Sequence, residues 1–109
     1  MTLIELKAIL DAAGYPVAYS HFTQTENNPV PDPPFITYLV DSSSNLFADN
    51  KVHQKINNVQ IELYTDYKDL EAEEKLEDLL DENEIPYETL EEWIETEQMY
   101  QKIYETRMI

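Results

Sequence analysis

The sequence lacks cysteine, has one glycine, and carries seven lysine and arginine residues against 23 aspartate and glutamate residues. The absence of cysteine excludes a disulfide framework and thiolate chemistry. A single glycine, Gly14, argues against a glycine-rich phosphate-binding loop. The net charge of −16 opposes direct binding to a nucleic-acid backbone or to an anionic membrane.

Long apolar runs are missing as well. Glu5 and Asp11 interrupt the N-terminal segment, so we expect neither a signal peptide nor a membrane span there. Hydrophobic residues still make up 42% of the 109 residues, which is enough for one core. We therefore expect a single domain over residues 1–109 and no membrane partner.

Residues for catalysis or metal binding are also scarce. Only His21 and His53 could act as histidine bases, and neither lies in a nucleophile motif or near a cysteine. Two stretches that begin like calcium loops, at Asp41 and Asp81, lack the glycine required at the sixth position. The sequence therefore predicts no enzyme activity, no catalytic residue, no cofactor and no metal site.

Two segments have helical signals. Thr2-x-x-Glu5 forms a capping box before an apolar stripe, and Gly14 follows it, which predicts a helix over residues 3–13. A second amphipathic helix begins after Asp66 or Asp69 and reaches about Glu82. Its outward side is almost entirely acidic.

Strand-forming residues cover three segments: 17–22, 35–40 and 51–65. Alternation around Val59, Ile61 and Leu63 predicts one buried face and one wet face. Between the strands we expect a stiff, proline-rich connector up to Pro34, with a proline-motif ligand as the alternative. Residues 41–50 are expected to form a loop.

The last segment, residues 87–109, fits either a helix or a hairpin. A third long helix would leave only three strands, so we favour a hairpin with its turn near residues 95–98 and a strand over residues 98–108. The fold class that follows is α+β, with a mostly antiparallel sheet of about four to five strands packed against two helices.

The acidic charge is unevenly placed, with sixteen acids and four bases after residue 65. It indicates a solvated surface, a surface that repels DNA, a surface for a basic partner, or a mimic of DNA. Eight tyrosines indicate either sheet packing or a protein interface.

This order of elements resembles the tail terminator, or tail completion (head–tail joining), proteins of long-tailed bacteriophages. The likeness rests on short patterns without a catalytic signature. They are Tyr15–Tyr19, Pro33–Leu39, Phe47–Asn50 and Ile61–Thr65. The ending, Glu97–Glu105, also looks like small phage neck and tail proteins from Gram-positive hosts.

The resemblance implies a ring, usually a hexamer, that caps the tail tube in the virion and joins it to the head. The implied partners are other copies of the chain, the tail tube protein and the head-completion or neck proteins, and assembly takes place in the host cytoplasm. DNA would pass through the lumen without specific binding. The extreme acidity departs from many members of the family.

Candidate residues for a subunit or tube interface are Leu46, Phe47, Asp49, Asn50, Tyr100 and Tyr104. Leu46 and Phe47 could instead fold back over the core as a lid. Alternative functions are an acidic DNA-mimic inhibitor, another small neck or minor tail component, or a generic binding module.

Overall fold

The computed structural model describes residues 1–22, 30–48 and 50–108, with the backbone alone at positions 46, 48 and 53. Its elements are α1 (Leu3–Asp11), β1 (Val17–Tyr19), β2 (Phe35–Ser43), β3 (Leu46–Ala48), β4 (Lys51–Gln54), β5 (Asn57–Thr65), α2 (Leu70–Glu82), β6 (Glu88–Ile94) and β7 (Met99–Met108). Five strands form one sheet in the order β1-β2-β5-β7-β6, and β3 pairs with β4 separately. Only β1 and β2 run parallel among these pairs. The predicted α+β class with a mostly antiparallel sheet is confirmed.

Local capping determines where the helices begin. The Thr2 side chain accepts a hydrogen bond from the Glu5 amide, and α1 follows it. Asp69, not Asp66, caps α2 by accepting from the Ala72 amide at 3.0 Å. After α1 the chain turns at Gly14, whose φ of +86° lies in the region that glycine adopts without strain.

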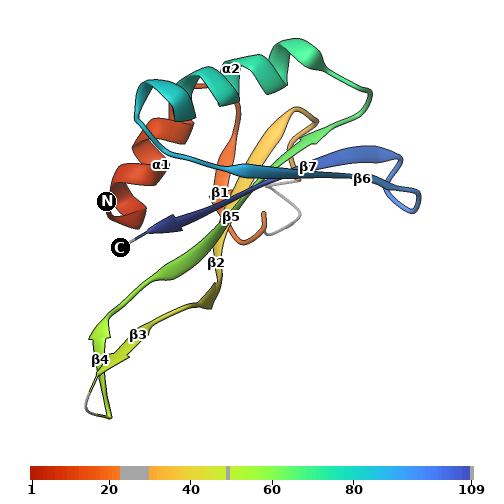
Figure 1. Cartoon of the computed structure of the whole chain (residues 1–109). Coiled ribbons are helices and arrows are strands. Elements are labelled where there is room, and N and C mark those ends of the chain that lie inside the picture. The colour runs from red at the N-terminus through yellow and green to blue at the C-terminus, as the bar shows by residue number, and fades with distance from the viewer. Residues whose placement is uncertain (23–29, 49, 109) are drawn as a thin grey trace.

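Both helices pack on one face of the sheet, as Figure 1 shows. Their apolar stripes meet the inward side chains of β2, β5 and β7 in one hydrophobic core. The fully buried members are Leu6, Leu10, Ile36, Val59, Ile61, Leu63, Leu76, Leu80 and Tyr104. The alternation predicted for β5 therefore identifies its core side correctly.

The opposite face of β5 is not wet, contrary to the prediction. Glu62 is 6% exposed and accepts hydrogen bonds from the Tyr64 hydroxyl and the Gln101 amide. Phe35 stacks on Tyr64 with ring centroids 4.9 Å apart. Burial, and then the hydrogen bond to Glu62, raise the pKa of Tyr64 to about 12. Side chains from neighbouring strands cover this face, and alternation within one strand does not reveal them.

The C-terminal segment is a hairpin, so the helix alternative is wrong. Strands β6 and β7 pair from Glu88↔Glu105 to Ile94↔Met99, and β7 also pairs with β5 along its length. The turn lies over residues 95–98, where Gln98 has a φ of 51°. Strand β7 is thus an inner strand and β6 forms an edge.

The loop predicted over residues 41–50 is wrong for residues 41–43, which belong to β2, and for residues 46–48, which form β3. Pairing between β2 and β5 continues past a bulge at Val40/Ser42 as far as Ser43↔Asn57, and the β3–β4 hairpin extends this ribbon. We call residues 44–56 the arm. It projects from the body in Figure 1 and helps to give the molecule its longest dimension of 49 Å.

Candidate interaction surfaces

The arm carries exposed apolar side chains at its outer end. Phe47 is 75% exposed and Val52, its partner in the β3–β4 register, is 43% exposed. Asn50, with a φ of 63°, lies in the turn between the two strands. The lid interpretation is therefore wrong for Phe47. Asp49 lies outside the described residues, and at Leu46 only the backbone is described.

The two candidate tyrosines of β7 lie in different surroundings. Tyr104 is fully buried, and its hydroxyl donates to Glu77 at 3.1 Å. It is a core residue and not a surface anchor, which corrects the prediction. Tyr100 is half-buried and packs edge-on against Trp93, with ring centroids 4.8 Å apart. Tyr100 lies next to the edge strand β6, where other side chains are more exposed than it is.

The lysines of the body are all held in ion pairs. Lys7 binds Asp11 at 2.9 Å, and Lys75 lies 3.6 Å from Glu71, each within one helix. The other two, Lys68 and Lys102, belong to the network described next. Positive charge on the body is thus neutralised locally.

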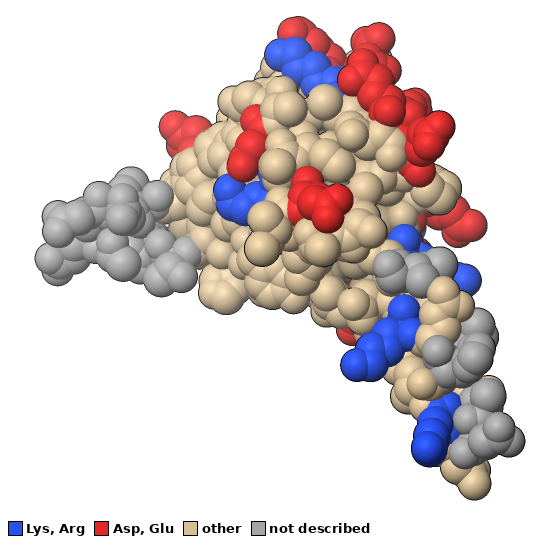
Figure 2. Space-filling model, turned by 90° about the vertical axis from the view of Figure 1, so that its left-hand side faces the viewer, with Lys and Arg blue, Asp and Glu red and all other residues tan. Residues whose placement is uncertain are grey.

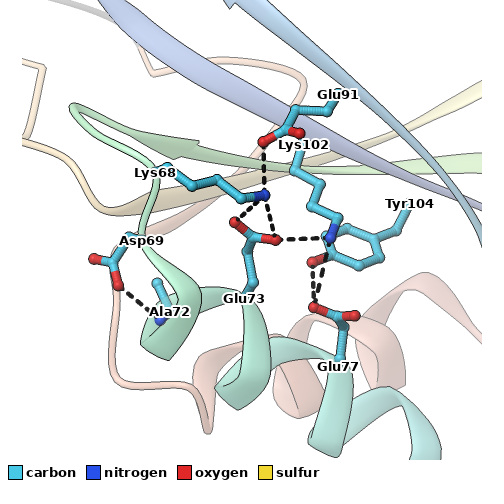
Figure 3. Close-up of polar contacts among 8 residues, drawn as sticks. All are labelled: Lys68, Asp69, Ala72, Glu73, Glu77, Glu91, Lys102 and Tyr104. Carbon is cyan, nitrogen blue, oxygen red and sulfur yellow. Dashed lines mark hydrogen bonds and ion pairs between the residues drawn. The ribbon is translucent and has the colours of Figure 1, made fainter.

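A buried carboxylate organises the contact between α2 and the sheet (Figure 3). Glu73, whose side chain is 8% exposed, lies 2.8 Å from Lys68 and 2.7 Å from Lys102. Lys68 also binds Glu91 of β6 at 2.7 Å, and Lys102 reaches Glu77 at 3.8 Å. The network therefore ties α2 to both strands of the C-terminal hairpin.

These contacts favour the ionised forms of Glu73 and Lys68. Burial by itself would raise the pKa of Glu73, but hydrogen bonds from Lys102 and Lys68 outweigh it and lower the pKa below its ordinary value. Hydrogen bonds to Glu73 and Glu91 raise the pKa of Lys68. Burial, followed by the charge of Glu77, raises the pKa of Tyr104. The shifts of Glu73 and Lys68 both favour the ion pair between them, as suits a structural role.

The remaining three bases lie on the arm or at its base. Among the described residues, Lys51, Lys55 and Arg107 have no carboxylate within ion-pair distance. Lys51 is the first residue of β4 and Lys55 follows its last residue. Arg107 lies opposite Asn58 in the β5–β7 register, where the arm leaves the sheet. Figure 2 shows basic side chains along the arm and acidic side chains crowding the top of the body, where α2 lies. The sequence holds a signal for this separation, because residues 50–61 form an acid-free stretch.

Strand β6 is the second surface, and sequence reasoning missed it. Six of its seven residues are exposed, including Leu90 at 50% and Trp93 at 43%. It contains three glutamates, Glu88, Glu91 and Glu92, and no base. In the described part of the chain, β6 pairs only with β7, so its outer backbone groups face solvent. Charged residues commonly protect such an edge from aggregation, and an exposed edge can also accept another strand.

Two negative observations complete the description. Within residues 1–22, 30–48 and 50–108, no group of three or more His, Cys, Asp or Glu side chains is arranged to hold a metal ion. None of the described helices has the length and apolar character needed to cross a bilayer.

Comparison with known proteins identifies no relative: no family model, curated protein or solved structure matches the chain.

Proposed function

We propose that this chain is a structural virion protein that forms a ring, caps the phage tail tube and joins it to the head or neck. One observation carries the proposal: the chain presents two unlike surfaces, the arm and the β6 edge, that have no further partner strand among the residues the structure describes. Two different surfaces on one chain form heterologous contacts, and such contacts generate rings when the rotation closes.

The charge distribution supports a ring through which DNA passes. Helix α2 and β6 together expose many carboxylates, while their neighbouring lysines are already paired. An acidic wall repels the phosphate backbone and prevents DNA from adhering as it passes. We propose no chemical reaction for this chain. The ionisable groups of the α2 network instead hold α2 against the C-terminal hairpin.

Electron microscopy of the purified protein tests this proposal. We expect rings with a central channel, and six copies of the 12.8 kDa chain would have a mass of about 77 kDa. The rings should also bind to the ends of tail tubes from the phage that encodes the chain. Particles that show no ring, either alone or on tail tubes, would contradict the proposal.

A DNA-mimic inhibitor is the second candidate, favoured by the outer surface of α2. Glu74, Asp78 and Asp81 are exposed at intervals of four and three residues, about 4.5–6 Å along the helix axis. Regularly spaced carboxylates resemble a row of phosphates. A mimic should stay monomeric or dimeric and compete with DNA for a basic nucleic-acid-binding protein, which a ring protein should not do.

A further inference from the structure

We propose that the arm of one copy docks on the β6 edge of a second copy. The inference rests on the proposed self-association and identifies the surfaces that make it. The occupant of the β6 edge is thus another copy of this chain, and not DNA, a membrane or an unrelated protein.

Charge complementarity is the first reason. Lys51 and Lys55 are exposed on the arm, and neither has a carboxylate partner among the described residues. The β6 edge offers Glu88 and Glu92, and no cation within the described part of the chain is paired with either. Opposite charges across an interface favour the correct partner and orient its approach.

Apolar exposure and open backbone edges are the second reason. Phe47 and Val52 on the arm, and Leu90 and Trp93 on β6, are at least 43% exposed, so a contact would bury apolar area from both sides. Strand β4 pairs only with β3, and β6 only with β7, within the described residues. Each strand therefore has one side of its backbone available for strand addition.

Because the sequence contains no cysteine, every disulfide that forms in a cross-linking test must join introduced cysteines. One protein carries Val52→Cys on the arm and a second, of different tagged mass, carries Leu90→Cys on β6. After mixing and mild oxidation, we expect the mixed disulfide to exceed either homodimer several-fold. The matched control replaces Leu90→Cys with Ile4→Cys on α1, which is 84% exposed and lies outside the proposed contact.

The outcomes separate this inference from the ring proposal. If Val52→Cys couples to Leu90→Cys no better than to Ile4→Cys, arm docking on β6 is wrong, whether or not rings form. When both cysteines are placed in one chain, a ladder that extends beyond the dimer supports arm docking and ring closure together. A product that stops at the dimer supports the contact as a reciprocal exchange and contradicts the ring.

Charge reversal tests the role of the lysines and glutamates in the same assay. Lys51→Glu with Lys55→Glu, or Glu88→Lys with Glu92→Lys, should each reduce cross-linking between identical chains about tenfold. Glu91 is left unchanged because it binds Lys68. Mixing the two reversed proteins should restore cross-linking, since each arm then meets an edge of opposite charge. Failure of the mixture to recover would refute charge complementarity at this contact.

Discussion

Positive charges have opposite surroundings in two regions of the molecule. They are paired where α2 meets the sheet, and they are exposed on the projecting arm. At α2, Lys68 and Lys102 lie within 2.8 Å of the buried Glu73. On the arm, Lys51 and Lys55 are exposed to solvent and form no ion pair with any of the described residues. Charges that hold a fold together are paired within it, whereas unpaired charges on a projection are available to another molecule.

Aromatic residues show the same contrast. Tyr104 is enclosed beneath α2, where its hydroxyl donates to Glu77. Phe47 is three-quarters exposed at the far end of the arm. An exposed Phe contributes little to the stability of an isolated chain, but it can anchor an interface. Tyr104 thus belongs to the core of the body, whereas the ring of Phe47 is exposed on the arm.

Truncating one aromatic residue in each region should give the largest difference. Tyr104→Ala removes a fully buried ring and should lower the free energy of unfolding by about 3–5 kcal/mol. Phe47→Ala should change it by less than about 0.5 kcal/mol, because its side chain is already solvated. Urea unfolding of both variants measures these effects. Similar losses for the two variants would abolish the distinction between body and arm.

Glu73→Gln should give the next largest effect. It removes the carboxylate that Lys68 and Lys102 share, leaving the partly buried Lys102 with a weaker contact, for a loss of about 2 kcal/mol. Glu71→Gln is the matched control, since Glu71 is 81% exposed and lies 3.6 Å from Lys75. The control should melt like the wild type. A Glu73→Gln protein as stable as its control would show that the network does not stabilise the body.

Acid should remove that same contribution. The pKa of Glu73 is lowered in the folded chain, so its ionised form favours folding above its ordinary value of 4.5. The contribution is lost as the pH falls through the lowered folded value, when the carboxylate becomes protonated. Wild type and Glu73→Gln should therefore differ in stability at pH 7, and the difference should shrink as the pH falls below 4.5. A stability difference that does not shrink below pH 4.5, or that disappears by pH 6, would argue against this origin.

Removal of the α2 cap should have the smallest of these stability effects. Asp69→Ala deletes the acceptor of the Ala72 amide and should cost about 1 kcal/mol. Asp66→Ala, one turn earlier and exposed, provides the control. In thermal unfolding, Asp69→Ala should therefore have a lower melting temperature than Asp66→Ala. Equal melting temperatures would contradict Asp69 as the functional cap.

Features determined by neighbouring residues could be predicted from the sequence. The Thr2–Glu5 capping box, the positive φ of Gly14 and the apolar alternation along β5 each depend on a few adjacent positions. The end of α1 was placed two residues too late, because the helix stops at Asp11 with Ala12 as its cap. The C-terminal hairpin was also located, because its two strands are adjacent in the chain. Local chemistry is sufficient for features of this kind.

Features that depend on strand order could not be predicted in this way. The burial of Glu62 comes from Tyr64 and from Gln101, a residue on another strand. Residues 41–43 are polar, yet they form a strand because β5 pairs opposite them. At the candidate site, the exposure of Phe47 agrees with the interface interpretation, whereas Tyr104 was misplaced because its β7 position faces α2. The β6 edge was missed because only the sheet order shows it to be outermost.

Replacing the arm tests most directly whether it mediates self-assembly. The Ser44 amide donates to the Ile56 carbonyl at 2.9 Å, so an Asn-Gly turn in place of residues 45–55 can close β2 and β5 as an ordinary hairpin. We expect this variant to melt like the wild type and to stay monomeric in native mass spectrometry, at concentrations where the wild type forms a ring. A variant that folds and still assembles like the wild type, or a wild type that stays monomeric with and without tail tubes, would contradict assembly through the arm.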